Sequence, residues 1–192
     1  MSNFFRINEI FYSLQGEGAN AGKPAVFVRF SGCNLSCFFC DTDFSAYREM
    51  SVDEIVEAVC AFPTDFVVLT GGEPTLQVDK FLVDALHRVN KFLAIETNGT
   101  KDIDGDVDYV TLSPKETRKL ALKTADEVKI VYVGQDVEKF RDWISATHYF
   151  LQPCSRLVDG QWVDNRDEVI RYCLEHPKWR LSLQIHKILN IR

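Results

Sequence analysis

Three cysteines lie within eight residues, in the stretch Cys33-Asn-Leu-Ser-Cys37-Phe-Phe-Cys40. Three thiolates on one short loop can bind a compact metal centre, and thiolate ligands suit zinc or an iron–sulfur cluster. The ligand count separates the two, because structural zinc takes four protein ligands. The next candidates, Cys60 and His87, lie further along the chain on expected helices. A remote ligand would still complete a zinc site, so a zinc-binding module without enzymatic activity stays an alternative.

Polar and glycine residues follow the apolar runs that have the length of a β-strand. We expect such strands over residues 25–30, 66–69, 92–95, 109–112, 128–133, 149–151 and 181–185. Their downstream ends carry stretches such as Thr70-Gly71-Gly72-Glu73-Pro74. In a barrel of parallel strands these ends lie on one face, where active sites are built. Plain connecting loops use the same residue types, so a single loop of this kind is uninformative.

Longer amphipathic stretches separate these runs and predict repeated βα units. The clearest helix begins at Ser51, where Ser51 and Glu54 form a capping-box pattern ahead of apolar positions. Further helices are expected over residues 78–89, 137–144 and 168–174. Residues 7–13 alternate weakly and predict an extra strand before the first unit. We expect one α/β domain over residues 1–192.

Composition and charge exclude several classes of function. With 46% hydrophobic and 26% charged residues, the chain lies far from the composition of disordered proteins. A net charge of -6 gives no basic surface for nucleic acid, so a small-molecule partner is expected. No apolar run approaches the ~18 residues that span a bilayer, and the first residues lack the pattern of a secretory signal. We expect a cytoplasmic location, where cysteines favour metals over disulfides.

The cysteine loop resembles the signature of the radical S-adenosylmethionine superfamily. The resemblance rests on the spacing of the three cysteines, on Phe39 before the last of them, and on Gly71-Gly72-Glu73-Pro74. It implies an abridged (βα)6-type parallel barrel with an N-terminal extra strand. It also implies that Cys33, Cys37 and Cys40 hold a 4Fe-4S cluster whose open iron binds S-adenosylmethionine. Cleavage of that cofactor then yields a 5′-deoxyadenosyl radical, which abstracts hydrogen from the substrate.

The same resemblance implies a cofactor site at the strand ends. Gly72 and Glu73 are expected to accept hydrogen bonds from the amino group of S-adenosylmethionine, and Phe39 to pack on its adenine. Residues at later strand ends are expected to complete that site, namely Ser113, Pro114, Lys115, Gln152 and Ser155. Taken without the resemblance, Lys115 reads equally well as a solvated loop charge.

Further stretches resemble a group of short superfamily members that make deazapurines. They are IFYSLQGEG at 10–18, CDT at 40–42, ETNGT at 96–100, LQPCS at 151–155 and LQIHKILN at 183–190. This likeness implies a lyase that converts 6-carboxy-5,6,7,8-tetrahydropterin to 7-carboxy-7-deazaguanine with loss of ammonia, on the route to queuosine. An activating enzyme that makes a glycyl radical on a partner protein is the alternative within the superfamily, but it has no use for a small-acid pocket.

The likeness also assigns substrate residues. Arg29 lies in an apolar strand, where a buried charge needs a partner, and its planar guanidinium suits the substrate acid or a protein carboxylate. Glu17 shares the catalytic role with Arg29 by this assignment. The residues expected to contact the pterin are Leu14, Gln15, Gly16, Glu17, Thr70 and the terminal residue Arg192. His186 is a further candidate, although a lone histidine of this kind is more often at the surface.

Two further expectations concern metal and partners. Thr42 matches the protein ligand of a Mg²⁺ ion that clamps the substrate carboxylate, a sparse site that agrees with Mg²⁺ keeping its waters. Without the resemblance, Thr42 is a turn hydroxyl. A flavodoxin or ferredoxin is the expected electron donor. Because the chain is short for a full barrel, we expect a homodimer in which a second subunit covers exposed surface.

Overall fold

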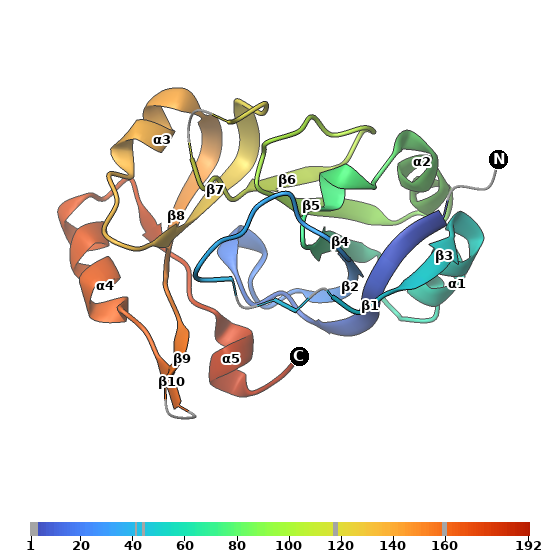
Figure 1. Cartoon of the computed structure of the whole chain (residues 1–192), viewed down its shortest axis with the longest axis horizontal. Helices are drawn as coiled ribbons and strands as arrows, with labels where there is room; N and C mark the ends of the chain where they lie inside the picture. Colours follow the sequence, from blue (N-terminus) through green and yellow to red (C-terminus); the bar gives the residue numbers. More distant parts are fainter. Residues whose placement is uncertain (1–3, 41, 44, 117–118, 159–160) are drawn as a thin grey trace.

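The computed structural model describes residues 4–192 apart from positions 41, 44, 117–118 and 159–160. One nine-stranded sheet curves through it in the order β11-β8-β7-β6-β5-β4-β2-β1-β3 and does not close (Figure 1). Its neighbouring parallel strands are β2 (Pro24–Phe30), β4 (Phe66–Gly71), β5 (Phe92–Thr97), β6 (Tyr109–Leu112), β7 (Thr124–Tyr132), β8 (Ser145–Pro153) and β11 (Arg180–Leu181). The expected abridged parallel barrel is therefore confirmed.

The extra N-terminal strand is also confirmed, and it is longer than predicted. β1 (Phe4–Leu14) pairs antiparallel with β2, and the short β3 (Arg48–Ser51) pairs antiparallel with β1 at the sheet edge. The loop after β1 contains a short 3-10 helix, η1 (Gly18–Asn20). Two backbone contacts draw this loop towards the concave side: Ala19 N donates to Glu127 Oε2 at 2.8 Å, and Gly18 N donates to Ser182 Oγ at 2.9 Å.

Four helices lie outside the curve of the sheet, two on each side in Figure 1: α1 (Val52–Cys60), α2 (Lys80–Arg88), α3 (Glu138–Trp143) and α4 (Arg166–Glu175). The capping box of α1 forms as predicted, since Ser51 N donates to Glu54 Oε2 at 2.7 Å and Glu54 N donates to Ser51 Oγ at 3.4 Å. Asp79 caps α2 by accepting from Leu82 N at 3.0 Å, so that helix begins later than predicted. The loop before it carries η2 (Pro74–Leu76).

Strand alternation divides the interior into an outer and an inner layer. In β2, Val26 and Val28 pack in the core beneath α1 and α2, whereas Phe27 and Arg29 face the concave side. In β7, Val128 and Ile130 belong to a second outer core, and Lys129 faces inward. The concave side thus receives every second residue of each strand, which includes several charged ones.

Some expected boundaries were wrong. The strand expected over 181–185 ends at Leu181, and α5 (Ile185–Leu189) follows it. β7 and β8 begin earlier than expected because their first residues are polar or small, which hides them from a search for apolar runs. The hairpin of β9 (Arg156–Val158) and β10 (Gln161–Val163) was not predicted, since strands this short carry little periodicity. No helix occurs between β5 and β6, nor in the described part of the connection from β6 to β7.

Candidate active site

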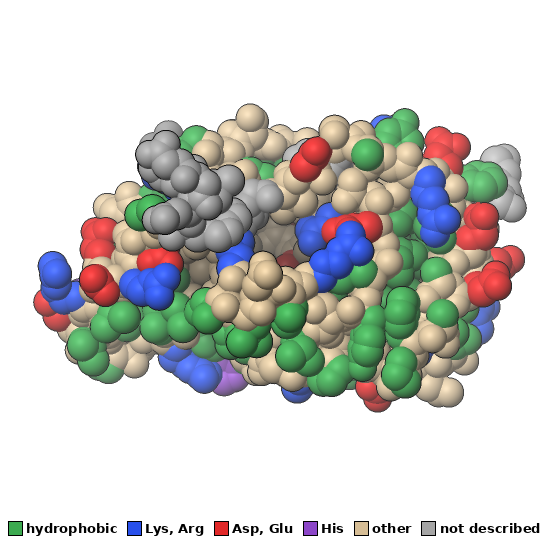
Figure 2. Space-filling view, turned by 90° about the horizontal axis from the view of Figure 1, so that it is seen from below, with side chains coloured by type: hydrophobic (Ala, Val, Ile, Leu, Met, Phe, Trp, Pro, Cys, Tyr) green, Lys and Arg blue, Asp and Glu red, His purple; other side chains and the backbone are tan. Residues whose placement is uncertain are grey.

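A cavity of about 360 Å³ occupies the concave side of the sheet. Figure 2 shows its hollow on the face that is viewed, with basic and acidic side chains at the rim. The cysteine loop, the loop after β1, the inward residues of the strands and the segment around α5 all contribute to the wall. Segments far apart in the sequence therefore meet at one pocket, as the strand-end pattern predicts.

The three cysteines of the loop after β2 all line this cavity. Burial raises the pKa of the Cys37 thiol, and the nearby Cys33 and Cys40 add to this while Lys115 opposes it. Within the described residues, no three His, Cys, Asp or Glu side chains converge as the ligands of a single ion do. Three soft thiols spread along one wall fit a cluster of several irons.

The wall next to the cysteines combines an aromatic ring with a lysine. Lys115 Nζ lies 5.5 Å from the centroid of the Phe39 ring and donates to Ser113 Oγ at 3.2 Å. Burial lowers the pKa of Lys115. Ser155 also lines the cavity, whereas Pro114 is buried and does not. This part of the wall has the ring, hydroxyl and cation that an adenosyl group with a carboxylate requires.

Gly72 and Glu73 hold the loop after β4 against the cysteine loop. A Cβ atom on Gly72 would lie 2.0 Å from the carbonyl oxygen of Gly32, so only glycine permits this approach. Glu73 is fully buried and does not line the cavity. Its carboxylate accepts from Thr97 Oγ1 and Asn98 N, each at 2.7 Å. The Glu73 side chain thus fixes two neighbouring loops, and its expected contact with the cofactor stays a prediction.

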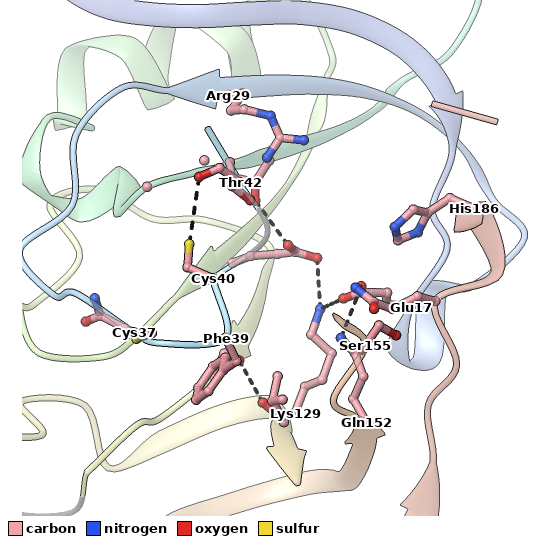
Figure 3. A pocket seen from close by; sticks show the side chains of 18 of the residues that line it. Glu17, Arg29, Cys37, Phe39, Cys40, Thr42, Lys129, Gln152, Ser155 and His186 are labelled. Atoms are coloured by element: carbon pink, nitrogen blue, oxygen red, sulfur yellow. Dashed lines mark hydrogen bonds and ion pairs between the residues drawn. The ribbon is translucent and has the colours of Figure 1, made fainter. Parts of the chain in front are cut away.

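A buried ion-pair network occupies the middle of the cavity (Figure 3). Lys129 Nζ pairs with Glu17 Oε2 and lies 3.3 Å from Glu96 Oε1. Burial alone would lower the pKa of Lys129, but the two carboxylates outweigh it and raise that pKa above its ordinary value. Burial would likewise raise the pKa of Glu17, yet Lys129 holds it below its usual range. Both partners are therefore charged at neutral pH.

Polar side chains extend this network to both sides. Gln15 Nε2 donates to Glu96 Oε1 at 3.1 Å, and Thr70 Oγ1 donates to Glu96 Oε2 at 3.1 Å. Gln152 Nε2 donates to Glu17 Oε1 at 3.2 Å, so its amide faces a residue assigned to the substrate. Gln15, Glu17 and Thr70 come together as expected, and Gln152 joins them through Glu17.

Arg29 and Thr42 both line the cavity, as expected of residues that bind a substrate acid and its metal. Arg29 Nε donates to Glu9 Oε1 at 2.9 Å, and Arg192 pairs with the other oxygen of that carboxylate. The protein carboxylate considered from the sequence is thus present beside Arg29. Because Arg29 uses its Nε for Glu9, its guanidinium is held at a fixed orientation on the cavity wall.

The segment around α5 closes the cavity on the side of the loop after β1. Ile185 N donates to the carbonyl oxygen of Gly16 at 3.0 Å. A Cβ atom on Gly16 would lie 2.3 Å from His186 Nδ1, so the glycine lets the histidine approach. Gly16 itself does not line the cavity, in contrast to the prediction, whereas Leu14, His186 and Arg192 do.

Sequence reasoning missed Glu9, Glu96 and Lys129 as site residues. Glu96 begins a polar stretch at a strand end, and Lys129 is a charge inside an apolar strand. A charge at such a position is rarely buried without a partner, which is the signal that points to it. Glu9 lies in a strand that alternates only weakly, and nothing in its local sequence marks it.

Comparisons with known proteins agree with this site. The sequence pattern of the Radical SAM superfamily matches residues 27–142. The chain is 51% identical to the 7-carboxy-7-deazaguanine synthase of Bacteroides thetaiotaomicron, over 97% of this chain and 98% of that one. The synthase of Nitratidesulfovibrio vulgaris is 41% identical, over 97% and 99% of the two chains. The crystal structure of QueE from Escherichia coli superposes with a TM-score of 0.78 at 28% identity and covers 95% of each chain.

Proposed function

The chain belongs to the radical SAM superfamily and, within it, to the 7-carboxy-7-deazaguanine synthases, and from that premise we propose how its own residues perform the reaction. The enzyme converts 6-carboxy-5,6,7,8-tetrahydropterin to 7-carboxy-7-deazaguanine with loss of ammonia, in deazapurine biosynthesis. The named relatives favour this reaction over the glycyl-radical activating enzyme and over the zinc module.

The charge of the cavity carries the proposal. The chain as a whole has a net charge of -6, yet among the residues that the structure describes five Lys or Arg and two Glu side chains line the cavity. A basic interior in an acidic protein attracts anions and holds them by charge-assisted hydrogen bonds. The substrate and S-adenosylmethionine each bring a carboxylate. The three thiols on the same wall bring the cluster within reach of both.

Cys33, Cys37 and Cys40 hold the 4Fe-4S cluster, and Phe39, Ser113 and Lys115 bind S-adenosylmethionine beside it. When bound, the cluster and S-adenosylmethionine supply the one-electron chemistry that removes a hydrogen atom from the substrate. The protein contributes orientation and exclusion of water. Gly72 keeps the two loops close, and Gln152 and Ser155 complete the wall. The buried walls on the concave side keep solvent from the reacting atoms.

Arg29 binds the substrate carboxylate with the terminal nitrogens of its guanidinium. Support comes from its position on the cavity wall and from Glu9, which fixes the guanidinium through Nε. At the other end of the pterin, Gln15, Glu17 and Thr70 face its amide and amino groups. Leu14 and Arg192 border the same compartment. Arg29 and Glu17 thus hold the substrate from two ends, which sets the position of its reacting carbon.

We assign Thr42 as the protein ligand of a Mg²⁺ ion that also binds the substrate carboxylate. Thr42 is partly buried and lines the same cavity as Arg29. One hydroxyl suffices because Mg²⁺ retains waters and takes oxygens from its substrate. The residues present fit such an ion, since a hydroxyl and a substrate acid supply only oxygen ligands.

A small electron-transfer protein, such as a flavodoxin or ferredoxin, is the proposed donor. The cluster loop lies at the surface: Cys40 is exposed, and Phe38 is 73% exposed with the Arg156 guanidinium 5.4 Å from its ring centroid. An exposed aromatic ring beside a cation gives a donor a place to dock.

We also propose a cytoplasmic location, because its reducing thiol pool suits three cluster-binding cysteines.

A homodimer is proposed from exposed apolar side chains on the last helices. Leu174 on α4 is 79% exposed, and Ile188 and Leu189 on α5 are more than half exposed. Figure 2 shows hydrophobic side chains gathered along the face that carries the hollow.

No helix in the described part of the chain is long and apolar enough to cross a membrane. We further propose that residues 1–192 act as one domain, supported by the continuous sheet.

The test is anaerobic turnover by the iron- and sulfide-reconstituted protein. The mixture contains S-adenosylmethionine, a reductant, Mg²⁺ and 6-carboxytetrahydropterin, and products are followed by mass spectrometry. Formation of 7-carboxy-7-deazaguanine supports the proposal. Cleavage of S-adenosylmethionine without this product would retain the superfamily chemistry and refute the substrate. Absence of cleavage by protein with an intact cluster would count against both.

A further inference from the structure

We propose that Lys129 is a specificity-determining residue of the substrate site, whose buried ammonium donates to the carbonyl oxygen of the substrate's pyrimidinone ring while Glu17 and Glu96 accept from its amide and amino groups. This inference rests on the proposed function. It deepens that function, because none of the sequence motifs includes Lys129. The residue lies on an inward position of β7, directly on the cavity wall (Figure 3).

The position of Lys129 is unusual for a structural residue. Its side chain is only 6% exposed, and those of Glu17 and Glu96 are 13% and 22% exposed. Buried ion pairs are weak stabilisers, since an apolar set of the same size often serves a core equally well. This network instead faces an open cavity and projects from three separate segments: the loop after β1, β5 and β7. A binding role accounts for charges that packing alone does not require.

The hydrogen bonds of Lys129 leave one donor for a ligand. An ammonium has three N–H donors. Glu17 and Glu96 take two of them, and no other hydrogen-bond partner of this ammonium is found among the described residues. The carboxylate of Glu127 also attracts the Lys129 ammonium. Lys115 and His186 are further titratable groups close enough to act on the Lys129–Glu17 pair. A neutral carbonyl oxygen is the group that fits a remaining N–H in this setting.

The pattern of donors and acceptors matches one edge of a pterin. A 2-amino-4-oxo pyrimidine ring presents a carbonyl acceptor next to an amide N–H and an amino group. Here Lys129 supplies an N–H for the carbonyl, and the carboxylates of Glu17 and Glu96, which both contact Lys129, supply acceptors for the amide and the amino group. A ring with an amino group in place of the carbonyl would set an N–H against the ammonium, which repels it. The site therefore favours the oxo ring in two ways. The oxo ring gains a hydrogen bond from Lys129, and the amino-substituted ring leaves that N–H of Lys129 without an acceptor.

The experiment measures this discrimination directly. The product-forming enzyme is inhibited with 6-carboxypterin and, separately, with 2,4-diaminopteridine-6-carboxylate, in which an amino group replaces the carbonyl. Wild type should bind the oxo compound at least about tenfold more tightly, the size expected of one charge-assisted hydrogen bond. In Lys129→Met the ratio of the two affinities should fall to about one or invert. Without the ammonium, the two carboxylates favour the diamino compound, which has more N–H donors. The KM of the substrate should rise more than kcat falls.

Controls separate this role from folding. Lys123→Met makes the same change at an exposed lysine just before β7, and it should keep the wild-type ratio and KM. Iron content and thermal melting report whether Lys129→Met is folded and loaded. If it is not, Lys129→Gln replaces it, because glutamine retains an N–H donor and should show a reduced preference for the oxo compound. The ratio of affinities in wild type tests the proposal independently of either variant.

The results that would contradict the role of Lys129 differ from those that would contradict the proposed function. An unchanged ratio in folded Lys129→Met, or a wild type that does not prefer the oxo compound, overturns the proposal. Failure of wild type to form product would instead refute the proposed function, before any variant is compared.

Discussion

Arg29 Nε lies 2.9 Å from Glu9 Oε1, so the arginine is tethered through its inner nitrogen at a position that lines the cavity. Both side chains are largely buried, with 21% and 27% exposed. A planar guanidinium fixed in this way can meet a carboxylate with two parallel bonds. Glu9 therefore orients the group that is proposed to bind the substrate acid.

We first predict that Arg29→Lys raises the KM of the pterin by about tenfold or more, because lysine keeps the charge but loses the bidentate geometry. Glu9→Gln should raise KM less, since it loosens Arg29 without removing it. Steady-state kinetics of product formation measure both. Arg88→Lys, at an exposed position of α2, is the matched control. Equal KM values in Arg29→Lys and wild type would contradict the assignment.

Thr42 gives a second prediction, on metal dependence. Thr42→Ser keeps the hydroxyl and should retain the wild-type dependence of activity on Mg²⁺. Thr42→Val has the same shape without an oxygen ligand and should need about tenfold more Mg²⁺ for half-maximal activity, the loss expected of one polar contact. Titration of activity with Mg²⁺ at fixed substrate measures this. If the two variants titrate alike, Thr42 is not the ligand.

Gly16 gives a third prediction, on packing. Gly16→Ala places a Cβ atom where His186 Nδ1 now lies, so the segment around α5 must move. We expect a loss of about 1–3 kcal/mol in the free energy of unfolding, as for other overpacked sites. Urea unfolding measures the loss. The double variant Gly16→Ala, His186→Ala should recover part of it, and a double variant no more stable than the single one would rule out this clash.

A fourth prediction concerns pH and Glu138, at the start of α3. Burial would raise the pKa of Glu138, but hydrogen bonds from Trp179 and Arg141, each at 2.7 Å, hold it below the ordinary 4.5. A carboxyl whose pKa is lowered by folding stabilises the protein above its unfolded pKa, and that contribution disappears as pH falls through the folded pKa. Stability from Glu138 is therefore present at pH 7 and lost in acid.

Glu138→Gln should accordingly cost about 0.5–1 kcal/mol at pH 7, a figure kept small because the side chain is 40% exposed. The difference from wild type should shrink as the pH falls below 4.5, the ordinary value for this carboxyl. Urea unfolding at several pH values tests this trend. Glu175→Gln, at an exposed position of α4, is the control and should show no such trend. A difference that grows in acid would reverse the assigned sign.

The features that the sequence alone could predict depend on residues that lie close together along the chain. The cysteine spacing, the Gly72 approach and the capping box at Ser51 each depend on residues a few positions apart. The parallel strands were recoverable because their apolar residues form contiguous runs. Those features sufficed for the superfamily and the fold. They also predicted that polar strand ends share a pocket, although Gly16, Glu73 and Pro114 are buried and do not line it.

Only the tertiary structure could pair the charges inside the cavity. Lys129 is separated by 112 residues from Glu17 and by 33 from Glu96, and Arg192 by 183 from Glu9. Strand alternation indicates which side chains face inward, but their partners depend on the order of strands and the curvature of the sheet. A charge buried on a curved sheet pairs with whatever lies across the concave side. That distance in space has no counterpart in the sequence.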